Sequence, residues 1–279
     1  MKNYSILGVD VGNSTCKTNT GVLFNSKITE VEPFGKTDTL FIDKKYYWLG
    51  EGEYDTTYRK VDKINYINFL FGALALSTNT VRNYVVLGLP LSQYKEDKSA
   101  LINMVLSNKE KYTKINGVEK HLIIDDIEVF PEGVVTLDDE YEGIVVDIGG
   151  RRRILNPISL PCGTINLYTD FIKKLNNKFS LDLVMNDAER IIKNGLILDG
   201  RNTNIDFAMD VYRAFTENLI TQLQVEYSLR TNSISLTGGG VISLYKTIKE
   251  RLGNGVSLQA NSIYANTKAY YELGCSIWQ

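Results

Sequence analysis

The sequence predicts an α/β protein of two lobes, built on one strand-and-turn unit that occurs twice. In the first copy, 6–17, a short apolar run carries Asp10 and ends in a turn that begins at Gly12. In the second copy, 144–150, the same order of apolar residues, one aspartate and two glycines returns about half a chain later. A third glycine turn, 235–241, also follows a short apolar run. Short β-branched runs of this kind are typical of strands that are covered on both faces.

The length and the charge of the chain agree with this interpretation. At 279 residues the chain is long for one core and sufficient for two halves of about 140 residues each. It has 31 Lys and Arg against 33 Asp and Glu, so no basic field argues for direct binding to nucleic acid. A near-neutral surface also does little to oppose self-association.

The cysteines and the apolar segments favour a cytoplasmic protein without a membrane partner. Three cysteines and one histidine are widely spaced, and they form no recognisable zinc pattern and no paired disulfide framework. A reducing compartment is therefore expected. The N-terminal residues lack a signal-like apolar run, and no segment approaches the ~18 apolar residues of a membrane span.

The turn after Asp10 has the composition of a phosphate-binding site. Burying an unpaired carboxylate is costly, so an aspartate in an apolar strand is expected where the strand meets a cation, water or ligand. The residues that follow offer backbone N–H groups, small hydroxyls and one positive charge: Gly12, Asn13, Ser14, Thr15 and Lys17. Together they suggest a phosphate cradle beside a metal-binding acid. The structural alternative is a hairpin turn with a capping aspartate.

The order of the three glycine turns resembles the superfamily of actins, sugar kinases and Hsp70 proteins. In that superfamily two Asp-Gly hairpins, one from each half, clamp the nucleotide phosphates, and a later glycine turn lies under the adenosine. The sequence most resembles the plasmid-segregating bacterial actins, the ParM-like and the shorter Alf-like proteins. Three further segments look like parts of that group: 86–92, 129–133 and 270–274. The resemblance spans nearly the whole chain and depends on the order of its motifs.

The resemblance implies a duplicated actin-like (ribonuclease H-like) fold, with an N-terminal lobe at 1–140, a C-terminal lobe at 141–279 and a nucleotide cleft between them. The stretch 179–204 has room for only a small insertion, which implies a reduced subdomain in the second lobe. The implied cofactors are Mg²⁺ and ATP, or GTP, because a glycine turn accepts either base. The further glycines expected at the nucleotide are Gly149, Gly150, Gly238, Gly239 and Gly240.

Two acids are expected to act in hydrolysis. Asp147 is expected to share Mg²⁺ and its waters with Asp10. Two carboxylates can lie close together around a hydrated metal ion more readily than in a core without water. Glu132 follows Pro131 at the exit of a strand, where a carboxylate can orient a water for in-line attack on a γ-phosphate. In the bacterial actins a glutamate in the matching Pro-Glu segment is implicated in hydrolysis, and the resemblance carries this role to Glu132. The structural alternative is a glutamate in the first turn of a helix.

The segment 186–195 is expected to form a short helix that stops at Gly195. It is similar to the Ala-Glu-x-Ile-Lys helix that contacts ribose and adenine in actins, which makes Lys193 and Asn194 candidate nucleotide contacts. An exposed helix face is the alternative for both residues.

Three arginines, Arg151, Arg152 and Arg153, stand where the family usually has small or hydroxyl residues. Strand alternation would send Arg151 and Arg153 to one face and Arg152 to the other. At least two of them are expected at the surface, while one could reach a phosphate. Their role and the details of the second phosphate loop stay open.

Hydrophobic spacing predicts the other elements. A core helix is expected over 64–76, where apolar residues recur at helical spacing, and the longest helix over 206–229. The segment 118–130 is expected to form two short strands, with a turn at 116–117 or at 125–126.

The preferred function is that of a polymerising actin-like ATPase whose filaments segregate plasmid DNA. Its expected partners are further copies of itself and a DNA-binding adaptor protein. Polymerisation and the role with DNA follow from the resemblance alone. The alternatives are a small-molecule kinase of the same superfamily and a nucleotide-gated scaffold that does not assemble.

Overall fold

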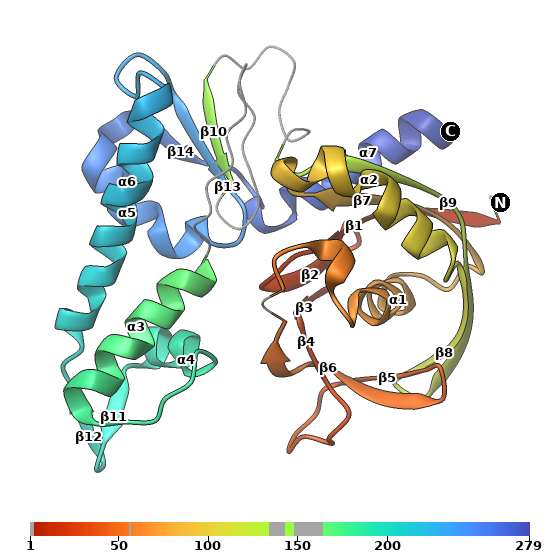
Figure 1. Cartoon of the computed structure of the whole chain (residues 1–279), viewed down its shortest axis with the longest axis horizontal. Helices are drawn as coiled ribbons and strands as arrows, with labels where there is room; N and C mark the ends of the chain where they lie inside the picture. The colour runs from red at the N-terminus through yellow and green to blue at the C-terminus, as the bar shows by residue number, and fades with distance from the viewer. Residues whose placement is uncertain (1–2, 56, 134–142, 148–163) are drawn as a thin grey trace.

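The chain forms two lobes, each with a sheet and a hydrophobic core of its own (Figure 1). This computed structural model describes residues 3–55, 57–133, 143–147 and 164–279. The first lobe contains the strands β1 (Tyr4–Val11), β2 (Thr15–Thr18), β3 (Leu23–Asn25), β4 (Lys27–Thr29), β5 (Asp38–Ile42), β6 (Lys45–Tyr54), β7 (Arg82–Leu89), β8 (Glu110–Ile115) and β9 (Val118–Pro131). Its helices are the 3₁₀ turn η1 (Lys60–Asp62), α1 (Tyr66–Ser77) and α2 (Leu91–Leu106).

The nine strands form one mixed sheet in the order β3-β2-β1-β7-β9-β8-β5-β6-β4, and the sheet curls around α1 (Figure 1). Strands β1, β7 and β9 run parallel, while β2 pairs with β1 in the antiparallel sense. Helix α1 is apolar around most of its circumference, as expected for a helix enclosed by a sheet. It begins at Tyr66, and Ile64 is 93% exposed, so the expectation that Ile64 belongs to the core face is wrong.

Strand β9 corrects the prediction of two short strands over 118–130. The turn lies at Asn116 and Gly117, which have φ angles of 50° and 85°, and β9 then runs without interruption from Val118 to Pro131. The pairing of β9 with β7 shifts register at Asp125. The alternative turn position, Asp125 and Asp126, is therefore a bulge within one continuous strand.

The second lobe contains a parallel sheet of β10 (Ile144–Asp147), β13 (Ile234–Thr237) and β14 (Val256–Leu258). Its helices are α3 (Thr164–Phe179), α4 (Asp187–Asn194), α5 (Asp206–Glu226) and α6 (Val241–Leu252), and a small hairpin joins β11 (Leu196–Leu198) to β12 (Arg201–Thr203). Helix α4 and this hairpin are the elements within 179–204, and the reduced subdomain expected there stays a prediction. Two 3₁₀ turns, η2 (Gly253–Gly255) and η3 (Ser262–Tyr264), lead to the last helix, α7 (Ala265–Trp278).

Helix α7 packs against β1 and β7 of the first lobe, so the chain ends beside its beginning (Figure 1). The Tyr4 hydroxyl donates to the Trp278 carbonyl oxygen at 3.4 Å, and the two backbones approach closely at Gly8. The division of the chain at residue 140 stays a prediction, and α7 is a segment of the second half that packs on the first. Within the described ranges, none of the helices has both the length and the apolar character that a membrane span requires.

Candidate functional site

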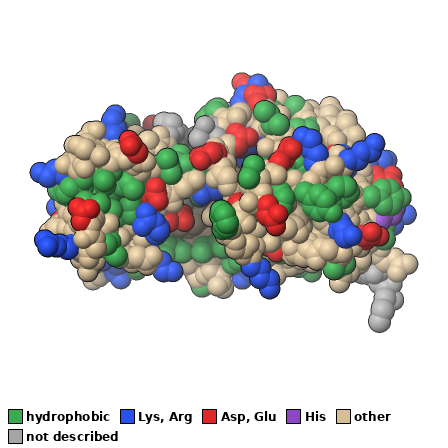
Figure 2. Space-filling model, turned by 90° about the horizontal axis from the view of Figure 1, so that it is seen from below, with side chains coloured by type: hydrophobic (Ala, Val, Ile, Leu, Met, Phe, Trp, Pro, Cys, Tyr) green, Lys and Arg blue, Asp and Glu red, His purple; other side chains and the backbone are tan. Residues whose placement is uncertain are grey.

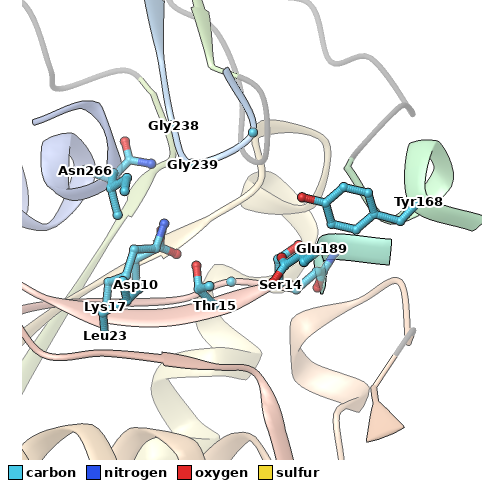
Figure 3. A pocket seen from close by; sticks show the side chains of 14 residues that line it. Asp10, Ser14, Thr15, Lys17, Leu23, Tyr168, Glu189, Gly238, Gly239 and Asn266 are labelled. Atoms are coloured by element: carbon cyan, nitrogen blue, oxygen red, sulfur yellow. The ribbon is translucent and has the colours of Figure 1, made fainter. Parts of the chain in front are cut away.

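A pocket lies between the two lobes, and both lobes line it (Figure 3). The lining residues from the first lobe are Asp10, Gly12, Asn13, Ser14, Thr15, Lys17 and Leu23. Those from the second half of the chain are Tyr168, Glu189, Gly238, Gly239, Gly240, Ile263 and Asn266. The pocket thus brings together the first and third of the three glycine turns identified in the sequence.

The turn between β1 and β2 is held rigidly. The Gly12 N–H donates to the Thr15 carbonyl at 3.1 Å, and a Cβ at Gly12 would lie only 2.8 Å from that same oxygen, so a glycine is required. The Ser26 hydroxyl donates to the Gly12 carbonyl at 2.6 Å, and the Ser26 N–H donates to the Ser14 carbonyl at 2.9 Å. These bonds fix the hydroxyls of Ser14 and Thr15 at the wall of the pocket.

Asp10 and Lys17 form an ion pair at the base of this turn. They are directly opposite each other on the antiparallel strands β1 and β2, which explains the distance of 3.1 Å between Asp10 Oδ2 and Lys17 Nζ. Both residues are buried. Burial alone would raise the pKa of Asp10, but the ammonium groups of Lys17 and Lys60 outweigh it and hold that pKa below its usual value.

Lys60 is a functional candidate that the sequence analysis missed. It lies on η1, is 3% exposed, and places its Nζ 2.6 Å from Glu132 Oε1, 3.5 Å from Asp10 Oδ1 and 3.1 Å from the Gly88 carbonyl. Burial alone would lower the pKa of Lys60, but the carboxylates of Glu132 and Asp10 outweigh it and raise that pKa. A lysine in a charged loop segment carries no periodic signal, so nothing in the sequence distinguished Lys60 from its neighbours.

Glu132 lies behind the pocket rather than in its lining. Its side chain is buried, and the ion pair with Lys60 connects it to Asp10, which does line the pocket. Its N–H donates to the Leu89 carbonyl at 2.8 Å, and the next N–H, of Gly133, donates to Asn266 Oδ1 at 3.0 Å. The structure therefore brings Glu132 within one buried lysine of the turn, and its role in hydrolysis stays a prediction.

The third glycine turn, Gly238–Gly240, connects β13 to the N-terminus of α6. Gly238 has a φ of 87°, which favours glycine, and a Cβ at Gly239 would meet no atom within 4 Å. The first N–H groups of a helix have no partner within it and carry a partial positive charge. This end of the pocket therefore suits an anion or a closely approaching flat ring.

Tyr168 on α3 and Glu189 on α4 form another part of the pocket wall, apart from the glycine turn (Figure 3). Burial, and then the neighbouring Glu189 carboxylate, raise the pKa of the Tyr168 phenol to about 12. The predicted contacts Lys193 and Asn194 lie on the same helix as Glu189, but they are exposed and do not line the pocket. Helix α4 thus contributes to the pocket through Glu189, one turn before Lys193.

Asp147 and its neighbours are described only in part. Asp147 ends β10, and its backbone pairs with Thr237, the residue before Gly238. Gly149, Gly150 and Arg151 to Arg153 lie outside the described residues. Among the described residues, no group of three or more His, Cys, Asp and Glu side chains could hold a metal, and each oxygen of Asp10 lies near a lysine. The Mg²⁺ site shared by Asp10 and Asp147 stays a prediction.

A hydrogen bond joins the two lobes near the Glu189 wall. Asn186 occupies the N-cap position of α4, yet its side chain makes no capping bond. Instead, its Nδ2 donates across the lobes to the Gly52 carbonyl on β6 at 3.2 Å. On β4, beside this strand, Lys27 lies 4.3 Å above the Tyr54 ring. Burial lowers the pKa of Lys27, and the Glu189 carboxylate of the other lobe partly opposes this shift. The Asn186 bond is thus a direct polar contact between the lobes on this side.

Comparisons with known proteins agree with this architecture. Residues 8–134 match the family model described as the N-terminal domain of actin like proteins. A 15-stranded ParM filament from Clostridium botulinum has 19% identity and a TM-score of 0.75, with 97% of this chain and 99% of that chain covered. The archaeal actin homolog Ta0583 in complex with ADP has 15% identity and a TM-score of 0.79, with coverages of 97% and 99%.

The Alp12 filament structure has 19% identity and a TM-score of 0.68, and both chains are covered completely. A comparison with curated protein sequences finds no match. The family match covers the first lobe, and the similar structures share the arrangement of both lobes. Residues 8–134 therefore match the N-terminal domain of actin-like proteins, and the whole chain adopts the actin-like fold of the similar structures.

Proposed function

We propose that this protein binds and hydrolyses ATP, or GTP, and polymerises into filaments that segregate plasmid DNA. One observation carries the nucleotide-binding part: the phosphate-cradle turn after Asp10 and the glycine turn at the start of α6 face each other across one pocket between the lobes. The proposed partners are further copies of the chain and a DNA-binding adaptor protein. Lys, Arg, Asp and Glu side chains are interspersed over the face seen in Figure 2, which favours an adaptor over direct contact with DNA.

The chain's own residues suit a nucleoside phosphate. Ser14, Thr15 and Lys17 offer hydroxyls and a positive charge at one end of the pocket, and Gly238–Gly240 offer the N-terminus of α6. The Glu189 carboxylate can accept hydrogen bonds from ribose hydroxyls. Mg²⁺, held through Asp10 and Asp147, would neutralise phosphate charge when bound. Glu132 would hold the attacking water.

The filament part of the proposal is supported by the similar structures that are filaments, those of ParM from C. botulinum and of Alp12. The nucleotide part is supported by the structure of Ta0583 with ADP. Because their identities to this chain are 19% or less, function has to be tested directly.

Light scattering and sedimentation with Mg²⁺ and ATP, recorded together with phosphate release, test the whole proposal. We expect nucleotide-dependent assembly followed by disassembly as phosphate is released. The Glu132→Gln variant should assemble but keep its filaments, because the attacking water has lost its base. Unchanged phosphate release in this variant would remove Glu132 from the mechanism. Absence of assembly with phosphate transfer to sugars or acids would favour the kinase alternative, and nucleotide binding without either would favour the scaffold.

Replacing Gly239 by leucine should block the pocket without damaging the fold. A Cβ at this position meets no atom within 4 Å, and the φ of Gly239 is not positive, so the unfolding midpoint should stay within about 2 °C of the wild type. The longer side chain occupies space at the pocket wall, and nucleotide affinity measured by fluorescence titration should fall at least about tenfold. Wild-type affinity in this variant would show that the nucleotide does not approach the turn.

Removing the Asn186 amide should speed nucleotide exchange. The Asn186→Ala variant loses the bond to the Gly52 carbonyl, whose net contribution is about 1 kcal/mol, so release of a fluorescent ADP analogue should be about fivefold faster. Asn202→Ala, on the exposed strand β12 of the same lobe, is the control and should leave the release rate unchanged. Equal release rates in all three proteins would show that this bond does not limit exchange.

A further inference from the structure

The Lys60 side chain forms ion pairs with both Asp10 and Glu132, while its backbone is held in place by neighbouring residues. The N–H of Lys60 donates to Gln93 Oε1 at 3.2 Å, and Gln93 Nε2 donates to the Tyr58 carbonyl at 2.7 Å. Arg59 forms an ion pair with the buried Asp97 of α2. The backbone of η1 is thus tied to α2, while the long Lys60 side chain reaches the other way, to the pocket floor.

The described charges around this floor balance. Asp10 and Glu132 contribute two negative charges, and Lys17 and Lys60 contribute two positive charges. Lys60 Nζ lies 2.6 Å from Glu132 Oε1 and 3.5 Å from Asp10 Oδ1, so its shorter contact is with the acid behind the pocket. A further anion beside Asp10 would disturb this balance. Lys17 lines the pocket and is the closer ammonium to Asp10, whereas Lys60 is the ammonium that contacts both Asp10 and Glu132.

We propose that Lys60 is a positioning residue that senses the terminal phosphate of a nucleoside triphosphate. Without that phosphate, its ammonium holds the Glu132 carboxylate in a buried ion pair, outside the pocket lining. With the phosphate in the turn at Ser14 to Lys17, the ammonium shifts toward the phosphate and frees Glu132 to hold a water. Lys60 thereby links the presence of the third phosphate to the availability of the base. This inference rests on the proposed nucleotide binding.

Lys63 provides a matched control three residues along the chain. Its side chain is 2% exposed, compared with 3% for Lys60, and its Nζ donates to the Asp55 carbonyl at 2.7 Å and lies 3.9 Å from Asp55 Oδ1. Within the described part of the chain, the Lys63 ammonium contacts Asp55 and neither Asp10 nor Glu132. Replacing it by glutamine therefore removes a buried ammonium from the same segment while leaving the ion pairs of Lys60 with Asp10 and Glu132 in place.

The test is isothermal titration of the full chain with AMPPNP and with ADP, in Mg²⁺ and below the assembly concentration. The ratio of the two affinities is measured for the wild type, Lys60→Gln and Lys63→Gln. We expect Lys60→Gln to weaken AMPPNP binding about tenfold or more relative to ADP, because a charge-assisted bond to phosphate is lost. Lys63→Gln should keep the wild-type ratio. A ratio in Lys60→Gln within threefold of wild type would overturn the proposal.

A kinetic cycle separates positioning from a structural role. If Lys60 acts through Glu132, single-turnover phosphate release by Lys60→Gln/Glu132→Gln should be no slower than by the slower single variant, whereas independent effects would multiply. Multiplying effects would contradict the proposal. If Lys60→Gln fails to fold, the double variant, which removes both charges, is compared with Glu132→Gln in the titrations. Wild-type protein that binds neither nucleotide would instead refute the proposed function itself.

Discussion

The Lys60→Met variant should lose about 3–5 kcal/mol of unfolding free energy at pH 7, the cost typical of removing one partner from a buried ion pair. The ammonium is 3% exposed and is the cation nearest to Glu132, whereas Asp10 keeps Lys17. Removing it leaves a buried carboxylate without its cation. Urea denaturation followed by circular dichroism measures the loss.

Two comparisons check this cause. Lys60→Met/Glu132→Gln removes both charges and should recover a large part of the lost stability, while Lys63→Met should cost less, because its partner Asp55 is one-fifth exposed and can be solvated. If the double variant is less stable than Lys60→Met, the loss does not come from an unpaired charge. If Lys63→Met loses as much unfolding free energy as Lys60→Met, the loss comes from removing any buried lysine in this segment, and not from the ion pair with Glu132.

The difference in unfolding free energy between the wild type and Lys60→Met should become smaller at acid pH. In the wild type the pKa of Asp10 is lowered below its unfolded value, so its contribution is complete above about pH 4 and disappears as the pH falls through the folded pKa. In the variant Asp10 has lost one of the two ammonium groups that lower its pKa, so less of this contribution remains to be lost in acid. Denaturation curves between pH 3 and pH 7 should therefore converge at the acid end, and a constant difference would contradict this account.

The Gly8→Ala variant should be destabilised by about 3 kcal/mol or more. A Cβ at Gly8 would lie 2.1 Å from the Thr267 carbonyl oxygen and 2.7 Å from the Tyr271 N, both backbone atoms of α7. Backbone atoms cannot turn aside as a side chain can, so α7 must move away from β1. Guanidinium denaturation measures the loss, and amide exchange along 265–278 should rise more than in the second-lobe helices.

Gly255→Ala is the control for this prediction. A Cβ at Gly255 would meet no atom within 4 Å and its φ is not positive, so its stability should stay within about 0.5 kcal/mol of the wild type. A normal amide-exchange pattern in Gly8→Ala would show that α7 can yield without leaving the sheet.

Local patterns predicted much of the fold. The β1 run, the α1 and α5 periodicities and the stop of α4 at Gly195 follow from spacing and turn residues, which act within a few positions of the chain. The errors arose where tertiary contacts decide. Pairing along β7 keeps β9 continuous through its bulge at Asp125. Helix α1 begins only at Tyr66, so Ile64 precedes it and lies in solvent.

In the candidate site, too, local features could be predicted from the sequence, whereas features that depend on tertiary contacts could not. The turn from Gly12 to Lys17 and the glycines at 238–240 could be recognised because glycines and small hydroxyls mark a backbone shape. Lys60 could not, since its importance comes from two acids that lie 50 and 72 positions away in the sequence. Glu189 was overlooked in favour of Lys193, because helix orientation relative to the other lobe is not a local property.

The packing of α7 on β1 and β7 also sets an order of events during synthesis. The strands of the first lobe end at Pro131, but the helix that covers two of them is made more than 130 residues later. At typical ribosomal rates this leaves about 7 to 30 seconds in which the face around Gly8 and Gly88 has no cover. A nascent chain therefore cannot complete its first lobe, or place Asn266 at the pocket, until α7 has been synthesised. Premature termination before residue 265 would release an apolar sheet face, a ready substrate for chaperones and proteases.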